Sequence, residues 1–571
     1  MNIQFMYAAN ETAKQLIERL TQSELTVQSV ETKFMGHDYL DITVLNGPNP
    51  LRVLNPTQAM VLAMDEEKAF AVLQVNKLQC LNREEDSINR IYHILVYDLE
   101  VISIRVEILG KAARVKYIKE NESLKVAQIA RRVSILLGLD MVMVEIVLTG
   151  KRKWKIAGFD LSPQLRAKDI ERLAKKMEKT LFQEEREVKL GADPEFMLVN
   201  SRSGKMVAAS EFFPKEGIVG CDAIRVPNRQ QRPIAEIRPR PERDPQHLIL
   251  NIRDALRNAN RMAPYANVKW VAGSQPFPGF SIGGHIHFSN ITLNAGLLRA
   301  LDNYLGIPIF LIEDQTTAVK RRRRYGKLSE YRNKNHGGFE YRTPGSWLVS
   351  REIATAVLCL AKIVVSRYYQ LKGNYLNNAE AQQAFYKGDQ EYFRAIFPLI
   401  WAEIEAIDLF AQYASDISII PWMINNRIAW NEKADLRKAW KIAVPKKKQA
   451  QYIAADDLAA SIAELQGERN SSSHTYGGES PPGTTAPGRR SSAQNSPRTT
   501  RSSPTPRSQR SIRGIISSSA PPGLYYRSSP VYRDMQINNP DLARVIEPQH
   551  IRRTLTTSEL ITAYPGVTAG Y

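Results

Sequence analysis

Four short segments in the middle of the chain place paired polar side chains two positions apart. Because a strand alternates its side chains between two faces, residues i and i+2 point the same way. Each pair is flanked by apolar or glycine residues, a pattern typical of a strand with one buried face. The sets are Asp193 with Glu195, Glu236 with Arg238 and Arg240, His285 with His287, and Glu340 with Arg342. Together they predict one sheet with a polar, concave side.

These side chains suit phosphoryl transfer. Carboxylate oxygens are the ligands that Mg²⁺ and Mn²⁺ prefer, and two carboxylates roughly 7 Å apart on one strand face could begin such a cluster. Arginine holds phosphate or carboxylate through two parallel hydrogen bonds. Gly283 and Gly284, just before the histidines, would let a ligand approach the backbone. The set therefore predicts a metal-assisted phosphoryl-transfer site.

A run of six cations, residues 320–324 and Lys327, lies between the third and fourth segments in TTAVKRRRRYGKLSEYRNKNHGG. Taken alone, it equally fits a solvated basic loop or a nucleic-acid patch. Its position favours a loop that clamps phosphate and carboxylate groups, since it leads into the strand that carries Glu340. This interpretation predicts phosphate binding by the arginines nearest that strand, Arg323, Arg324 and Arg332, rather than by Arg321 and Arg322.

The motif order D-P-E, E-x-R, GGHxH, RRxxYGK…YR and FEYRTP resembles that of the phage-type carboxylate–amine ligases, type 2. These belong to the superfamily of glutamine synthetase and glutamate–cysteine ligase. The resemblance covers residues 186–350 in motifs and extends to 445 in helices. It implies an α+β fold in which an antiparallel sheet curves into a funnel with helices on its outer side. It also implies an ATP-dependent reaction that joins a carboxylate to an amine through an acyl phosphate.

The resemblance implies roles for individual residues, with ATP and Mg²⁺ or Mn²⁺ as cofactors. The metal ions would be held by Asp193, Glu195, Glu236, Glu340 and His285. The superfamily often has Glu at the first of these positions, and aspartate is a competent ligand of shorter reach. The ATP phosphates would contact His285, His287, Arg323, Arg324 and Arg332. Catalysis would rest on Arg324, Arg332 and Arg342, and substrate binding on Arg238 and Arg240.

Residues 1–185 mix strand and helix patterns and predict a smaller α/β domain. RIYHILVYDLEVISIRVEIL reads as two adjoining strands, Ser123 begins a predicted helix, and a long charged helix is expected from Ser162. The region weakly resembles the C-terminal lobe of an ATP-grasp domain. That family has a metal-binding Glu and Asn where this chain has Gly158 and Asp160. The resemblance therefore implies a degenerate or merely structural domain.

Composition divides the rest of the chain. We expect a catalytic domain over 186–445 and a helical linker over 446–466. Residues 467–530 are rich in Ser, Pro and Arg and almost free of apolar side chains, so they predict a disordered segment. A basic tail, 531–571, follows and could become ordered on a partner. From residue 467 to the end there are thirteen arginines, no lysine and six acidic residues.

The net charge of +19 fits either nucleic acid or anionic substrates, so charge alone does not choose between them. The arginines of the tail predict weak contact with nucleic acid or an anionic surface. Only three cysteines occur and none form a CxxC pair, which argues against a zinc ribbon or a disulfide framework. The sequence shows neither an apolar run of about 18 residues nor a signal-peptide start. We therefore expect no membrane span and a cytoplasmic location.

Two other functions stay open. A metal-dependent hydrolase could hold zinc on the two strand histidines, but such sites usually need further histidines, and only His336, His474 and His550 follow in the sequence. A non-catalytic nucleic-acid-binding or scaffold protein would show salt-sensitive binding without ATP turnover. No motif encodes which small-molecule, peptide or protein carboxylate and amine would be joined. The oligomeric state is not encoded either.

Overall fold

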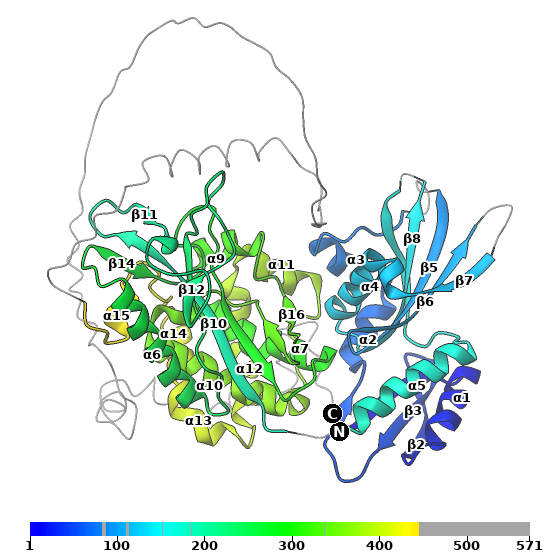
Figure 1. Cartoon of the computed structure of the whole chain (residues 1–571). Helices are drawn as coiled ribbons and strands as arrows, with labels where there is room; N and C mark the ends of the chain where they lie inside the picture. Colours follow the sequence, from blue (N-terminus) through cyan, green and yellow to red (C-terminus); the bar gives the residue numbers. More distant parts are fainter. Residues whose placement is uncertain (83–86, 110–113, 151, 184–185, 336, 445–571) are drawn as a thin grey trace, which may run out of the picture.

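The computed structural model describes residues 1–82, 87–109, 114–150, 152–183, 186–335 and 337–444. The predicted linker over 446–466, the predicted disordered segment over 467–530 and the predicted basic tail over 531–571 lie outside the described residues. The described chain has a mixed α/β fold with three sheets (Figure 1). An N-terminal part holds two of the sheets, and a larger part that begins near residue 186 holds the third.

The N-terminal part is built on a four-stranded and a five-stranded sheet. The first has the order β2-β3-β1-β4, with β1 (Asn2–Ala8), β2 (Thr26–Phe34), β3 (His37–Leu45) and β4 (Leu51–Val53). The second is antiparallel with the order β7-β6-β5-β8-β9, comprising β5 (Ile88–Tyr97), β6 (Glu100–Ile108), β7 (Arg114–Ile118), β8 (Met141–Thr149) and β9 (Trp154–Asp160). The helices are α1 (Glu11–Thr21), α2 (Thr57–Met64), α3 (Glu66–Val75), α4 (Leu124–Leu136) and α5 (Ala167–Leu181). The two adjoining strands and the helix predicted after Ser123 are confirmed, whereas the charged helix expected from Ser162 begins only at Ala167.

The larger part contains one antiparallel sheet of eight strands, whose main order is β12-β13-β10-β15-β17-β16. Its strands are β10 (Lys189–Asn200), β11 (Met206–Val207), β12 (Val219–Cys221), β13 (Ile234–Ile237), β14 (Val268–Val271), β15 (Gly284–Ser289), β16 (Tyr331–Asn333) and β17 (Phe339–Tyr341). The short strands β11 and β14 also pair with β10. The long strand β10 therefore organises the sheet.

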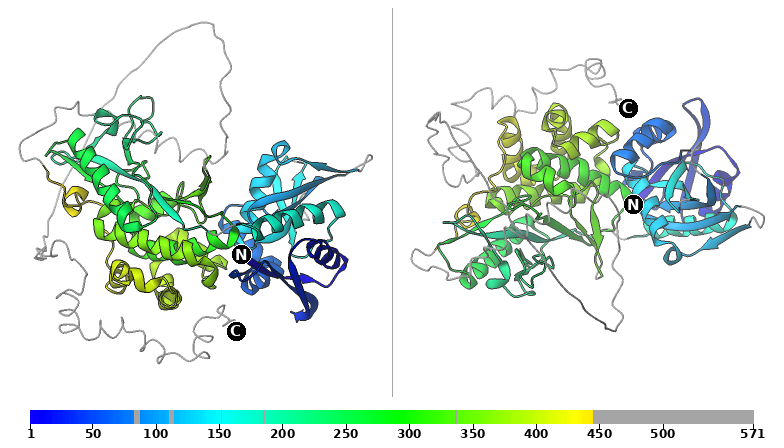
Figure 2. Two further views of the ribbon diagram at one scale, coloured as in Figure 1. Left: turned by 60° about the horizontal axis from the view of Figure 1, so that its bottom comes forward. Right: turned by 90° about the horizontal axis from the view of Figure 1, so that it is seen from above.

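Helices cover one side of this sheet (Figures 1 and 2). They are α6 (Pro245–Met262), α7 (Ala295–Leu301), α8 (Ile307–Ile312), α9 (Gln315–Arg322), α10 (Arg351–Arg367), α11 (Ala379–Lys387), α12 (Gln390–Glu405), α13 (Phe410–Ile417), α14 (Ile419–Asn425) and α15 (Leu436–Ala439). A π-helical turn, Asp302–Gly306, joins α7 to α8. The helices and one sheet face together enclose the largest hydrophobic core of the protein.

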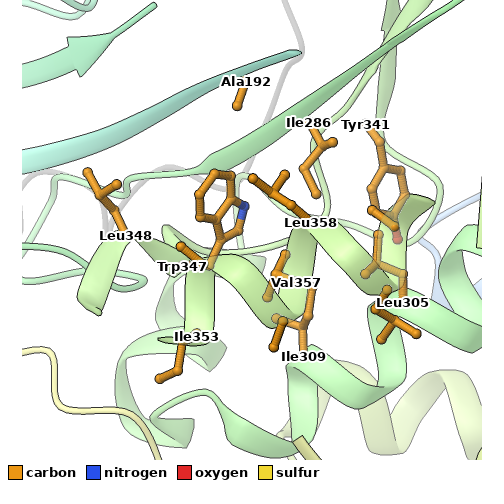
Figure 3. Packing of buried hydrophobic residues seen from close by; sticks show 14 of the residues in the cluster. Ala192, Ile286, Leu305, Ile309, Tyr341, Trp347, Leu348, Ile353, Val357 and Leu358 are labelled. Carbon is orange, nitrogen blue, oxygen red and sulfur yellow. The ribbon is translucent and has the colours of Figure 1, made fainter. Parts of the chain in front are cut away.

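The central strands bury every second side chain in this core. Ala192 of β10, Ile286 of β15 and Tyr341 of β17 lie opposite one another in the sheet and point toward α10, against Trp347 and Val357 (Figure 3). Since neighbouring positions on a strand point to the other face, the residues on either side of these three turn away from the helices. Asp193, His285, His287, Glu340 and Arg342, which belong to the polar sets predicted from the sequence, occupy five of those six positions.

One described stretch, Ala295–Ile312, is long and apolar enough to cross a membrane. It runs from α7 through the π-helical turn to α8, and 94% of it is buried inside the protein. Burial against other protein segments accounts for its apolar composition, so it provides no clear membrane span.

Candidate active site

Strand register brings the predicted polar residues together on one face of the eight-stranded sheet. Glu236 of β13 lies opposite Glu195 of β10. Asp193, two residues before Glu195, lies opposite His285 of β15.

The same register continues across the sheet. His287 of β15 lies opposite Glu340 of β17, and Glu340 lies opposite Arg332 of the edge strand β16. Segments almost 150 residues apart in the sequence thus form a continuous polar surface.

A cavity of about 230 Å³ lies on this face. The predicted site residues that line it are Asp193, Glu195, Glu236, Arg238, His285, Arg332, Glu340 and Arg342. Those that do not are Arg240, His287, Arg323 and Arg324. Sequence reasoning missed the remaining lining residues, Lys215, Glu216, Cys221, Asp222, Ala223 and Arg232, which come from loops and short strands with no polar spacing to mark them.

Three side chains are arranged to hold a metal ion. Asp193, His287 and Glu340 each offer one ligand atom, and these atoms all lie within 4.8 Å of one another. Glu340 is fully buried, and His287 Nε2 lies 3.0 Å from Asp193 Oδ2. His285 Nδ1 lies 3.2 Å from Asp193 Oδ1 and orients that carboxylate from the other side. Two carboxylates and one imidazole fit Mg²⁺ or, with the nitrogen ligand, Mn²⁺.

Three cations surround the buried Glu340. Lys334 Nζ lies 2.5 Å from Glu340 Oε2, Arg332 Nη1 lies 3.4 Å from the same oxygen, and Arg342 Nε lies 3.0 Å from Oε1. Sequence reasoning missed Lys334. The sequence could have pointed to Lys334, because it lies in the turn between β16 and β17. Both strands carry predicted site residues, and a turn between them folds back over the site.

The acidic side chains differ in how readily they ionise. Burial raises the pKa of Glu195 well above its usual range, the carboxylate of Asp222 raises it further, and a hydrogen bond of 2.6 Å from Gly283 N offsets only part of this. Burial and the charge of Asp193 raise the pKa of Glu236 to about 7, although Arg238 lies 2.7 Å away. Crowded carboxylates of this kind favour a bound cation, which would stabilise their charged forms.

The pKa of Asp193 shifts in the opposite direction. Burial alone would raise the pKa of its carboxyl group, but hydrogen bonds and charge from His285 and His287 outweigh burial and hold the pKa far below its usual range. Asp193 is therefore ionised at neutral pH and ready to bind a metal ion.

Two of the glycines in the motifs are required by packing. A Cβ on Gly283 would lie 2.3 Å from His285 Nε2, so any larger residue would displace the imidazole. Gly338 has φ +76°, and a Cβ there would lie 2.1 Å from the carbonyl oxygen of Phe288. The second glycine lets the turn after β16 lie close against β15, and this places Lys334 over Glu340.

The basic segment differs from the expected loop. Residues 320–322 form the end of helix α9, and Arg321 and Arg322 are buried. Arg321 donates hydrogen bonds of 2.6 Å to Thr343 O and 3.0 Å to Arg342 O, which hold the chain just after β17.

The other three arginines of this segment differ in burial. Arg322 pairs with Glu313 and stacks between Phe310 and Phe385, with its guanidinium 4.7 Å and 4.5 Å from the two ring centres. Arg323 and Arg324 are exposed at the end of the helix. The buried pair therefore stabilises the fold.

Comparison with known families agrees with this geometry. Residues 190–442 match the family model described as phage phiEco32-like COOH.NH2 ligase, type 2. The matched region begins with β10 and contains the whole polar sheet face. The match supports a carboxylate–amine ligase. Membership of the glutamine synthetase superfamily stays a prediction.

Solved structures give only weak likenesses. One described as ATP-grasp ligase PsnB with a minimal precursor has a TM-score of 0.19 and 14% identity, over 22% of this chain and 64% of that one. Macrocyclase MdnB from Microcystis aeruginosa MRC has a TM-score of 0.21 and 10% identity, over 31% of this chain and 97% of that one. A bifunctional glutathione synthetase from Pasteurella multocida has a TM-score of 0.28 and 11% identity, over 47% of this chain and 49% of that one. TM-scores this low do not support a shared fold or function. No curated protein matches the chain.

Proposed function

We propose that residues 186–445 catalyse ATP-dependent joining of a carboxylate to an amine. The observation that carries this proposal is the cluster of Asp193, His287 and Glu340 with Arg332, Lys334 and Arg342 around Glu340, at a cavity lined by Asp193, Glu340, Arg332 and Arg342. Metal ligands next to a set of cations are what phosphoryl transfer requires. The match of this region to the carboxylate–amine ligase family supports the same reaction. We also propose that its antiparallel sheet is the funnel of a glutamine-synthetase-like domain.

The metal-binding role is assigned to the carboxylates and one histidine. Asp193, His287 and Glu340 would hold one Mg²⁺ or Mn²⁺ ion, and the crowded Glu195 and Glu236 provide ligands for a second. When bound, such ions neutralise the phosphate oxygens of ATP. His285 then acts through Asp193, to which its Nδ1 is hydrogen-bonded.

The arginines and the lysine act on the transferred group. In the first step a carboxylate oxygen of the substrate attacks the γ-phosphorus of ATP, the bond to the β-phosphate oxygen breaks, and ADP leaves. Arg332 and Arg342 would hold the equatorial oxygens of the phosphoryl group in transit, where planar donors that grip two oxygens are most effective. Lys334 would add a point charge beside Glu340.

In the second step the amine nitrogen attacks the acyl carbon. Phosphate leaves, the amide forms, and the amine loses one proton to solvent or a nearby base. Arg232, Arg238 and Lys215 line the cavity with Asp222 and could bind substrate carboxylate and amine groups. Arg240 is a poorer candidate for substrate binding, because its side chain is 79% exposed and paired with Glu242.

Product analysis tests this function. The full-length protein is incubated with ATP, Mg²⁺ and pools of amino acids and short peptides, and products are detected by mass spectrometry. We expect ADP and phosphate to form only with both substrates present, and a product lighter than their sum by one water. A Glu340→Gln variant is the matched control, since it removes one metal-ligand charge without changing side-chain size. Hydrolysis of peptides without ATP consumption would instead favour the hydrolase alternative.

A further inference from the structure

The segment that carries Arg332 into the cavity lies at the edge of its sheet, where Arg342 N donates to Glu330 O and the Thr343 hydroxyl donates to Lys327 O, each at 2.8 Å. The edge strand β16 has three residues and pairs only with β17 among the described strands. Before it, Ser329 adopts φ +56°, a strained conformation for a residue with a side chain. Asp302 holds this turn by accepting hydrogen bonds from Ser329 N, at 3.0 Å, and from the Ser329 hydroxyl. A short edge strand after a strained turn needs support from outside the sheet.

The N-terminal part provides that support. Arg132 of α4 donates a hydrogen bond of 2.7 Å from Nη1 to the carbonyl oxygen of Leu328. Leu328 is buried and directly precedes the strained Ser329. The same guanidinium donates from Nη2 to Asn76 Oδ1 at 3.3 Å. One arginine thus ties the turn before β16 to two helices of the other part of the molecule.

Asn76 extends this connection into the helices of the ligase region. Its Nδ2 donates to Gln382 Oε1 at 2.5 Å, and its Oδ1 also accepts from the Tyr386 hydroxyl at 3.0 Å. Gln382 and Tyr386 both belong to α11, which packs against α3 (Figure 1). The junction around Arg132 is therefore fixed on three sides, and its position does not depend on a single contact.

We propose that Arg132 is a positioning residue for Arg332, so that the N-terminal part completes the active site of the ligase region. Arg132 fixes Leu328, Leu328 fixes the turn, and the turn sets where β16 enters the sheet. Arg332 lies four residues after Leu328, and its Nη1 lies 3.4 Å from Glu340. Since a displacement of about 1 Å in a phosphoryl-binding group can cost roughly a hundredfold in rate, this support matters for catalysis. The catalytic half of this proposal rests on the proposed ligase function.

The neighbouring residue is a matched control. Arg131 is on the same helix and is half-buried like Arg132. Its hydrogen bonds, however, stay within the N-terminal part, at 2.7 Å to Leu99 O and 2.6 Å to Glu120 Oε1. Arg131→Ala and Arg132→Ala therefore remove equal side chains from one helix but differ in whether a hydrogen bond to the ligase region is lost. Arg132→Lys keeps the charge and loses the fork that spans two acceptors.

Two measurements test the proposal in the full-length protein. Hydrogen–deuterium exchange follows the amides of residues 327–333, with amides of β10 reporting global unfolding. We expect faster exchange at 327–333 in Arg132→Ala and, to a lesser degree, Arg132→Lys, with unchanged exchange in β10 and in Arg131→Ala. ATP turnover should show a kcat lower by roughly ten- to a hundredfold in Arg132→Ala only, with little change in KM for ATP.

The outcomes separate the two proposals. If wild-type protein turns over no ATP with any substrate pool, the ligase function fails, while the exchange data still decide whether Arg132 holds the segment. Equal exchange at 327–333 in Arg131→Ala and Arg132→Ala would overturn the positioning role. Faster exchange with wild-type kcat in Arg132→Ala would equally overturn it, because the contact would then be structural only.

Discussion

Replacing Arg321 with lysine should destabilise the protein although the charge is kept. Arg321 is 2% exposed and spans two backbone acceptors, Thr343 O and Arg342 O. Its guanidinium also fills the space above Gly326, where a Cβ would lie 1.8 Å from Nη1. A lysine ammonium can reach one of the two carbonyls but not both in the same plane.

The size of the effect follows from these two contacts. A hydrogen bond from a charged donor contributes about 1.5–3 kcal/mol, and a buried carbonyl left without a partner adds to the loss. We therefore expect Arg321→Lys to lower the free energy of unfolding by about 2 kcal/mol. For a domain of this size that corresponds to a decrease in Tm of roughly 4–8 °C.

Differential scanning calorimetry measures this effect, with Arg324→Lys as the matched control. Arg324 lies three residues later and is exposed, so its replacement should change stability by no more than about 0.5 kcal/mol. Below its Tm, Arg321→Lys should keep most of any ATP turnover. Equal Tm values for the two variants would refute a structural role for Arg321.

Three further predictions concern the site and its support. Arg332→Lys should lower ATP turnover by roughly one to three orders of magnitude, the loss seen when one positioned transition-state donor is removed. Lysine at the exposed Arg257 is the control and should leave turnover unchanged. Equal turnover in the two variants would exclude Arg332 from the phosphate site. Gly283→Ala should abolish metal-dependent activity in a folded protein because its Cβ would meet His285 Nε2 at 2.3 Å, and a fully active variant would contradict this packing. Burial raises the pKa of Asp302 to about 6, so the folded state binds a proton more tightly than the unfolded state. The stability from this proton is present below about pH 4 and is lost as pH rises through 6, by about 3 kcal/mol in all. Asp302→Asn should flatten that part of the stability curve in urea titrations, and an unchanged curve would exclude Asp302 as its source.

Local spacing was enough to predict which residues share the polar face. Alternation along a strand depends only on backbone geometry, so the pairs around Asp193, His285 and Glu340 could be assigned to one side before the strand order was known. The antiparallel sheet and its helices on one side follow the predicted fold class. Which strands are neighbours depends on pairing between distant segments, and no local pattern contains that information.

Two features of the site depended on this distant pairing. His287 joins Asp193 and Glu340 in the proposed metal site because the register of β15 against β17 sets it opposite Glu340. The predicted ligand His285 also lies near both carboxylates, with Nδ1 3.2 Å from Asp193 Oδ1 and 3.4 Å from Glu340 Oε1. Both histidines share a face, so spacing could not distinguish them. Lys334 likewise reaches Glu340 only because the turn after β16 folds back over the site.

The basic segment shows a second limit of prediction from local sequence. A run of arginines suggests exposure, yet Arg321 and Arg322 are buried because α9 packs beneath the end of β17. A helix signal was present in the sequence, since the side chain of Asp314 accepts hydrogen bonds from Thr316 N and Thr317 N at the start of α9. Burial of the arginines could not be inferred from that signal, because it requires the acceptors that β17 and Glu313 supply.

Binding of Mn²⁺ together with a non-hydrolysable ATP analogue tests the central claim most directly, because it needs no knowledge of the carboxylate or the amine. Electron paramagnetic resonance of free Mn²⁺ gives the number of bound ions in wild-type protein and in folded Asp193→Asn and Glu340→Gln variants. We predict saturable binding that the analogue strengthens in wild-type protein and that falls at least tenfold in affinity in both variants, in line with the loss of a charged metal ligand. Unchanged Mn²⁺ and nucleotide affinity in both variants would contradict a metal–ATP site on this sheet.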